Sequence, residues 1–141
     1  MILVLHNVTS TQRLVDTAKI AFDNDAMFVV TKPGGTAAQA GIPEVSKMAY
    51  RLNKPFLVLP DLKDALELLS PEKVFLVTGS GRTVSGEEVK GKVMVVLPGT
   101  ENGFSKFELT LGEQVSLTEG KMSEANPVVL ASLLFYCLRK T

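Results

Sequence analysis

The chain has 141 residues, of which 45% are hydrophobic and 21% charged, with 15 basic and 15 acidic side chains. These values exclude disorder for most of the chain and predict one domain over residues 1–141. The longest nearly unbroken apolar stretch, residues 127–138, is shorter than the roughly 20 residues of a membrane-spanning helix. Because the first residues also lack the features of a signal peptide, we expect a cytoplasmic protein without a membrane partner.

Short runs of branched aliphatic residues alternate with segments of helical period, which predicts an α/β fold: a mostly parallel sheet with helices on both faces. The predicted strands are residues 2–5, 26–31, 56–59, 74–78, 93–97 and 113–117. The predicted helices are a segment that starts at Thr9-Ser10, then residues 42–52, 61–69 and about 126–139. Since the last helix is apolar nearly all round, we expect the sheet and a second subunit to cover it.

Three polar, glycine-bearing segments follow predicted strands: residues 78–82, 98–104 and 118–126. Ligands collect at the carboxyl ends of parallel strands, where glycine lets the backbone approach closely, so the three segments together could enclose one small molecule. Each segment alone also fits an ordinary turn. Gly79 and Gly81 begin a dinucleotide-binding motif that Val84 breaks, and no P-loop motif occurs, so ATP hydrolysis is not indicated.

One cysteine, Cys137, and one histidine, His6, are too few soft ligands for a structural zinc site, so we predict no metal. Cys137 is expected to pack within the last helix rather than to react. His6, at the end of a strand, could act as a general base, but a histidine hydrogen-bonded to backbone is the favoured interpretation. Arg82 fits equally a phosphate-binding cation and a surface cation paired with Glu87 or Glu88.

Residues 96–108 resemble the second motif of the SpoU-type SPOUT methyltransferases. The match keeps four motif positions, whereas the motif's glutamate meets Thr100 and Glu101 stands one place later. The kept positions are Leu97, Gly103, Ser105 and Glu108. Independently of this likeness, Ser105 and Glu108 have the spacing of a capping box at the start of a short helix.

Two further stretches carry the same resemblance. Residues 115–129 resemble the family's third motif, with Asn126 at the matching asparagine. The first motif is echoed loosely after the first strand, where Ser10 replaces an asparagine, Asp16 replaces an arginine, and Arg13 lies one turn earlier. The resemblance therefore spans nearly the whole chain and is weakest where a substrate would bind.

The resemblance implies a C-terminal trefoil knot, bound S-adenosyl-L-methionine and a homodimer joined through the C-terminal helix. It implies an RNA methyltransferase, with the ribose 2′-hydroxyl of tRNA or rRNA as the expected acceptor. The expected catalytic residues are Arg13, Asn7 and Ser10. The expected cofactor-binding residues are Thr78, Gly79, Pro98, Gly99, Glu101, Gly103, Leu117, Met122 and Asn126.

Two other functions stay open at this point. A non-catalytic relative could keep the knot and the cofactor as a binding or regulatory module, which the shifted first motif favours. A flavodoxin-like ligand binder without the knot is the third possibility. In the same way, Arg13 fits either a catalytic role or an ordinary exposed position on a helix. Capture of RNA would require a shared face for the basic residues Arg13, Lys19, Lys32, Lys47, Arg51 and Lys54.

Overall fold

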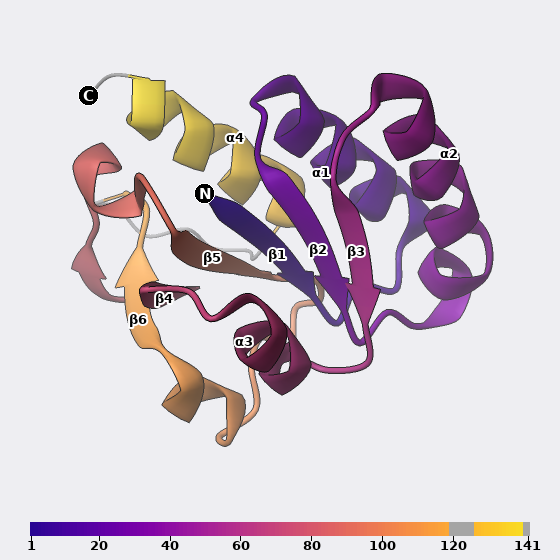
Figure 1. The fold of residues 1–141 in the computed structure, drawn as a ribbon. Coiled ribbons are helices and arrows are strands. Elements are labelled where there is room, and N and C mark those ends of the chain that lie inside the picture. Colours follow the sequence, from indigo (N-terminus) through magenta and orange to yellow (C-terminus); the bar gives the residue numbers. More distant parts are fainter. Residues whose placement is uncertain (119–125, 140–141) are drawn as a thin grey trace.

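The computed structural model describes residues 1–118 and 126–139, and it contains one sheet of six parallel strands (Figure 1). The order across the sheet is β3-β2-β1-β5-β4-β6. The strands are β1 (Ile2–His6), β2 (Met27–Thr31), β3 (Phe56–Leu59), β4 (Lys73–Thr83), β5 (Val93–Pro98) and β6 (Glu113–Ser116). The predicted α/β class with a parallel sheet is therefore confirmed.

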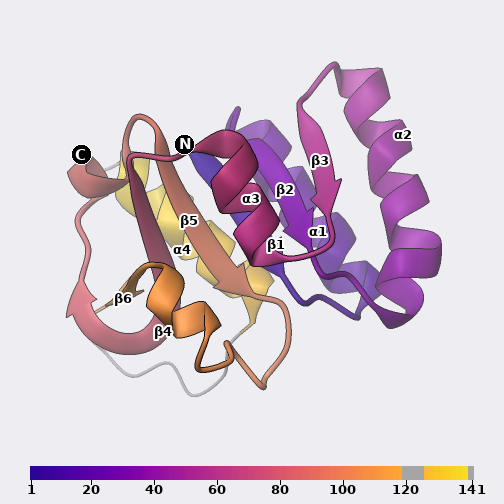
Figure 2. The same cartoon turned by 60° about the horizontal axis from the view of Figure 1, so that its bottom comes forward.

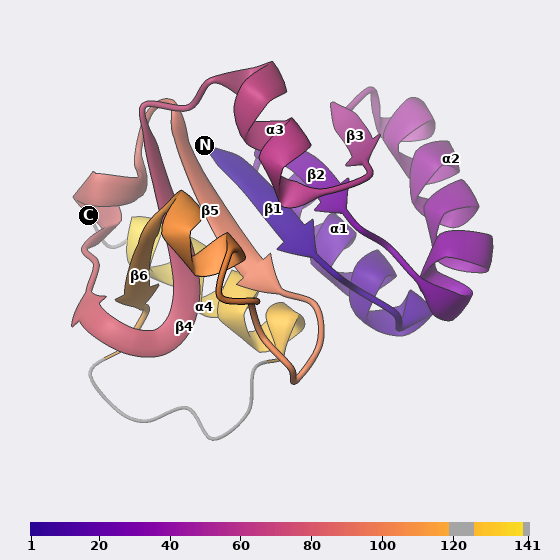
Figure 3. The same ribbon diagram turned by 90° about the horizontal axis from the view of Figure 1, so that it is seen from below.

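Helices cover both faces of this sheet (Figures 2 and 3). On one face lie α1 (Thr11–Asp23), α2 (Ile42–Leu52) and α4 (Pro127–Arg139). On the other face lie α3 (Leu62–Leu69) and the short 3-10 helix η3 (Glu108–Leu111). Two further short helices, η1 (Ala37–Gly41) and η2 (Gly86–Val89), lie in connections. No helix among the described residues is long and apolar enough to cross a membrane.

The central strands β1 and β5 are buried along their whole length. Side chains of β1 alternate, so that Leu3 and Leu5 join the core beneath α1, α2 and α4, while Ile2 and Val4 join the core beneath α3. Burial on both faces explains why these strands read as continuous apolar runs in the sequence.

The predicted helix starts are also present. Ser10 caps α1, because its hydroxyl accepts a hydrogen bond from the Arg13 amide at 3.2 Å. Asp61 caps α3, where its carboxylate accepts from the Leu62 amide at 2.8 Å and Asp64 completes a capping box. Both caps lie at the edge of the sheet where β1 and β3 end.

One predicted loop is wrong. Residues 78–82 were expected to form a ligand-binding loop, but they continue β4 as far as Thr83. The strand keeps pairing with β6 after a register shift, so that Val115 lies opposite both Val77 and Arg82. A side chain at Gly81 would collide with the carbonyl oxygen of Gln114, so glycine here permits strand pairing rather than ligand access. The expected third loop and knot depend on residues 119–125, which lie outside the described residues.

Candidate functional site

The carboxyl ends of β1 and β5 form the switch point of the sheet. These two strands are neighbours, yet the chain passes from β1 to β2 on one side and from β5 towards β6 on the other. Connections that leave in opposite directions open a crevice at this place, which is where parallel α/β sheets bind ligands. Two groups of functional side chains lie here.

The first group centres on His6, the last residue of β1, which is 1% exposed. Its Nδ1 lies 2.7 Å from the hydroxyl oxygen of Thr31 at the end of β2. Its Nε2 lies 2.6 Å from Oε2 of Glu108 at the start of η3. The ring also stacks on Phe104, with ring centroids 6.0 Å apart. Both ring nitrogens therefore have partners, which a fully buried imidazole requires.

Glu108 is held in place by the predicted capping box. Its Oε1 accepts a hydrogen bond from the Ser105 amide at 2.7 Å, and the Ser105 hydroxyl accepts one from the Glu108 amide at 3.2 Å. Burial raises the pKa of the Glu108 carboxyl, but the Ser105 amide and the adjacent His6 together lower this pKa below its ordinary value. The carboxylate is therefore ionised at neutral pH, with one oxygen bound by the cap and the other against the imidazole.

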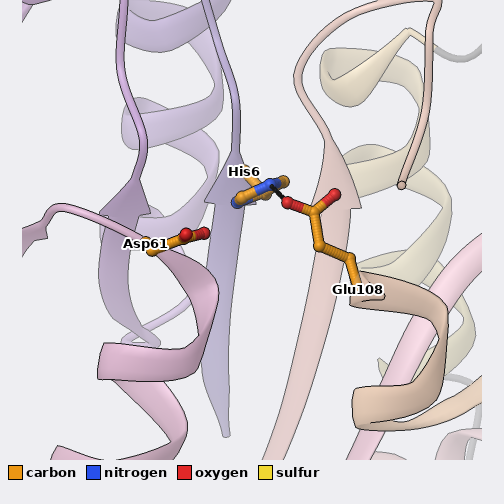
Figure 4. A group of neighbouring side chains, drawn as sticks. All are labelled: His6, Asp61 and Glu108. Carbon is orange, nitrogen blue, oxygen red and sulfur yellow. Dashed lines mark hydrogen bonds and ion pairs between the residues drawn. The ribbon is translucent and has the colours of Figure 1, made fainter. Parts of the chain in front are cut away.

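Asp61 completes this group from α3. Figure 4 shows its carboxylate and that of Glu108 directed towards the His6 ring from opposite sides. One ligand atom from each of the three residues lies within 4.8 Å of the others, and Asp61 is the exposed member. We call His6, Asp61 and Glu108 the His6 cluster. One imidazole nitrogen with two carboxylates is a donor set suited to divalent cations such as Mn²⁺, Zn²⁺ or Fe²⁺.

The second group lines an open pocket of about 270 Å³. We call it the Arg13 pocket, since Arg13 is its one cationic lining residue. One wall is the first turn of α1 and the segment before it, and the other wall is the segment that follows β5. The lining residues are Thr9, Ser10, Arg13, Gly99, Thr100, Glu101 and Asn102. A guanidinium with nearby hydroxyls and main-chain amides suits a phosphate group.

The two groups are joined through the backbone. The Gly99 amide donates to the carbonyl oxygen of His6 at 2.6 Å, and the Asn7 side-chain amide donates to the Thr100 hydroxyl at 3.5 Å. Gly99 is required by this approach, because a Cβ there would lie 2.5 Å from the Val8 nitrogen and 2.7 Å from the His6 carbonyl oxygen. The Arg13 pocket and the His6 cluster are therefore successive parts of one sheet edge.

The structure brings together part of the predicted site. Ser10, Arg13, Gly99 and Glu101 share the Arg13 pocket, and Asn7 contacts it through Thr100. Among the remaining predicted residues, Pro98 ends β5 opposite His6, and Gly103 forms a turn with positive φ. Four others lie outside the described pocket lining: Thr78 and Gly79 in β4, Leu117 in the core, and Asn126 as the cap of α4. Met122 lies outside the described residues.

Sequence reasoning missed the His6 cluster. The expected partner of the His6 ring was the backbone, whereas its partners are the side chains of Thr31 and Glu108. The prediction of no metal counted soft ligands and overlooked the carboxylates of Asp61 and Glu108. A usable signal was present, because a lone histidine that ends an apolar strand must find buried polar partners. Arg82 belongs to neither group, since it pairs with Glu88 and Glu113.

Solved structures share this fold at low sequence identity. The SpoU methyltransferase AviRb from Streptomyces viridochromogenes matches with a TM-score of 0.79 and 15% identity, over 99% of this chain and 60% of that chain. The chain thus spans about three fifths of AviRb. A structure described for 2-OH methylation of C/U34 on tRNA matches with a TM-score of 0.75 and 14% identity, over 98% of this chain and 93% of that chain. At such identities the likeness shows the fold alone.

Relatives with much higher identity have a different description. A protein of Aeropyrum pernix named "Putative type II restriction enzyme ApeKORF2002P" is 40% identical over 96% of this chain and 90% of its own length. A protein of Methanocaldococcus jannaschii named "Putative type II restriction enzyme MjaORF1200P" is 41% identical over 79% of this chain and 80% of its own length. The model of the RecB-family nuclease family (DUF2122) matches residues 35–137.

These matches correct the functional prediction. The resemblance to SpoU-type enzymes gave the right fold, but the assignment to that family, the RNA methyltransferase activity and the S-adenosyl-L-methionine cofactor are wrong. The non-catalytic SPOUT-like alternative is set aside on the same findings. Motif positions such as Gly103 and Glu108 support backbone turns and a helix cap, which different activities on one fold can share. The chain belongs to the family of RecB-family nucleases (DUF2122).

Proposed function

We propose that this protein is a nuclease that hydrolyses phosphodiester bonds in DNA at the edge formed by β1 and β5. The observation that carries the proposal is the His6 cluster, in which a buried histidine and two carboxylates converge at the switch point of the sheet. The family description supports a nucleic acid substrate, and the names of the two archaeal relatives support DNA in particular.

The residues of the His6 cluster fit a divalent cation. Metal–ligand bonds of about 2.1 Å allow two ligand atoms on one ion to lie up to about 4.2 Å apart, and the ligand atoms of the cluster lie within 4.8 Å of one another. Asp61 is the exposed member of the cluster, and its carboxylate also caps α3. His6, Asp61 and Glu108 would hold the ion, which would neutralise charge on the phosphate and lower the pKa of a bound water.

The protein's own groups position the rest of the reaction. The Arg13 guanidinium and the hydroxyls of Thr9 and Ser10 bind the phosphate in the Arg13 pocket, beside Gly99. The Thr31 hydroxyl fixes the orientation of the His6 ring through Nδ1, and a bound ion would replace the hydrogen bond between Nε2 and Glu108. Asp61, as the member that reaches solvent, faces the water that attacks phosphorus while the bond to the leaving sugar oxygen breaks.

Cleavage of DNA tests the proposal directly. Purified protein is incubated with supercoiled and linear plasmid DNA in Mg²⁺, Mn²⁺ or Zn²⁺, or in EDTA, and the products are resolved on gels. We expect nicked or cut DNA with at least one metal and none in EDTA. Intact DNA under all metal conditions, with protein verified as folded by circular dichroism, would contradict the proposal.

Metal binding gives a readout that does not depend on activity. Titration calorimetry with Mn²⁺ compares the wild type with Asp61→Asn, which keeps a good helix cap for α3 but removes the charge. The matched control is Asp64→Asn, which alters the other half of the same capping box. We expect weaker binding by about 10-fold or more only for Asp61→Asn. Equal affinities in all three proteins would reject the metal site.

The homodimer through α4 stays a prediction. Val129 and Tyr136 are exposed on this mostly apolar helix, as expected for a surface that a second subunit would cover. Sedimentation equilibrium of the wild type and Val129→Glu tests it. A dimer that dissociates in the variant is the expected result, and a monomeric wild type contradicts it.

A further inference from the structure

The outer face of α2 combines a largely exposed aromatic ring with two cations that form no ion pair with any residue in the described part of the chain. Tyr50 is 90% exposed, whereas the other side of the helix buries Val45, Met48 and Ala49. Lys47 and Arg51 are exposed, and Lys47 lies three residues before Tyr50 and four before Arg51, so it neighbours both on the helix surface. We call Lys47, Tyr50 and Arg51 the α2 stripe.

The cations of the α2 stripe differ from several other cations on the surface. Neither Lys47 nor Arg51 takes part in an ion pair with any residue that the structure describes. By contrast, Lys63 pairs with Glu67 and Lys90 pairs with Glu87. The single acidic residue of α2 is Glu44 in the first turn, where it complements the helix dipole. The stripe therefore presents two cations that form no ion pair with a described residue, three and seven residues after Glu44, on a chain whose net charge is zero.

From these observations we infer that the α2 stripe binds a single-stranded segment of nucleic acid. Lys47 and Arg51 would contact successive phosphates, and the Tyr50 ring would stack on an unpaired base, which is how surfaces that bind single strands combine charge and aromatic faces. Because Tyr50 is 90% exposed, its ring is available for such stacking.

The position of α2 fits this role. The helix begins near the carboxyl edge of the sheet, where the His6 cluster lies, and runs along the outer side of the molecule towards the opposite edge (Figure 1). The α2 stripe spans residues 47–51, about 6 Å along the helix axis, so it can contact neighbouring nucleotides of one strand. This inference rests on the proposed nuclease function, and it assigns to the α2 stripe the binding of a strand that continues beyond the cleavage site.

Fluorescence anisotropy with a labelled 20-nucleotide oligo(dT) and a labelled 20-base-pair duplex tests the inference in EDTA, where cleavage does not interfere. Lys47→Gln with Arg51→Gln should weaken oligo(dT) binding about 10-fold or more at 0.1 M salt and reduce the salt slope by about 1.4. Lys63→Gln with Lys90→Gln is the control with the same loss of charge, and it should bind as the wild type does.

Tyr50→Ala should weaken oligo(dT) binding about 10-fold with little change for the duplex, and Tyr50→Phe should restore binding. Because the chain has two tyrosines and no tryptophan, the Tyr136→Phe protein leaves Tyr50 as its one strong fluorophore, which oligo(dT) should quench. Wild-type affinity in the Lys47 and Arg51 variant, or unquenched Tyr50, would overturn the inference while leaving the nuclease intact. A wild type that binds neither probe would also overturn the inference, whereas the proposed function is judged separately by the cleavage assay with metal.

Discussion

The pair formed by His6 and Glu108 and the ion pairs of Arg82 are two charged groupings on one sheet, and they differ in burial. His6 is 1% and Glu108 7% exposed, whereas the Arg82 side chain is 45% exposed with Glu88 at 2.6 Å and Glu113 at 2.7 Å. A buried polar pair costs stability unless the fold supplies every partner, while exposed ion pairs contribute little. We therefore place the proposed chemistry at the buried pair, and we expect the exposed pairs to add little to the strand pairing that joins β4 to β6.

The largest expected effect is loss of cleavage when the buried pair is altered. Glu108→Gln keeps the size of the side chain but removes the charge beside His6, so we expect the cleavage rate to fall by more than about 100-fold. Gel assays of plasmid DNA measure it. The matched control is Glu113→Gln in the exposed grouping, which should cut at the wild-type rate. Equal activity of both variants would remove the distinction between the two groupings.

A second effect is expected on the free energy of unfolding, at the place where Gly99, directly after β5, lies against the segment that follows β1. In Gly99→Ala the new methyl group meets the Val8 nitrogen at 2.5 Å, so the strand ends must separate, and we expect a loss of about 2–4 kcal/mol. Urea denaturation followed by circular dichroism measures the free energy of unfolding. Gly34→Ala is the control, since its nearest new contact is a side-chain carbon at 3.7 Å. A Gly99→Ala protein as stable as wild type contradicts this account.

A smaller effect is expected in the exposed grouping. Arg82→Ala removes the pairs to Glu88 and Glu113, but solvent screens both, so the melting temperature should fall by a few degrees at most and DNA cleavage should not change. Differential scanning calorimetry measures the shift at low and high salt. A large drop that is independent of salt would show that Arg82 carries more than a screened surface interaction.

The smallest effect is the pH dependence of Glu88. Its hydrogen bond from the Ser85 amide, followed by that from Arg82, lowers the pKa of the Glu88 carboxyl below 4.5. A carboxyl whose pKa is lower in the folded state stabilises the protein above its unfolded pKa and loses this contribution as the pH falls through the folded pKa. The stability advantage of wild type over Glu88→Gln should therefore be present at pH 7 and be lost as the pH falls through the lowered pKa of the Glu88 carboxyl. A constant difference over this range would contradict the cause assigned here.

Local sequence signals were sufficient for most of the fold. All six strands and all four α-helices were predicted near their observed bounds, because burial on two faces and helix caps leave short-range patterns. The exception was the end of β4, where Gly79, Ser80 and Gly81 resemble a turn. In the structure this stretch continues β4, because it pairs with β6 beyond a register shift.

The candidate site was accessible to sequence reasoning only in part. The capping box of Ser105 and Glu108 was predicted because its members are three residues apart. The same carboxylate meets His6 across 102 residues of sequence, and no local pattern encodes that contact. Ser10 and Arg13 could be placed from the sequence, because they lie at the boundary between a predicted strand and a predicted helix. The proposed role of Asp61 could not, because it depends on α3 beginning at the edge of the sheet where β1 ends.

The central position of β5 has a consequence for folding during synthesis. Because β5 lies between β1 and β4, it is the strand that joins the first three strands to β4 and β6 in the described sheet. During synthesis, the ribosome must therefore release residues 93–98 before the two halves can merge, and Glu108 emerges later still. A nascent chain shorter than this lacks one wall of the crevice, so the proposed cleavage site would form only after residue 108 has been made.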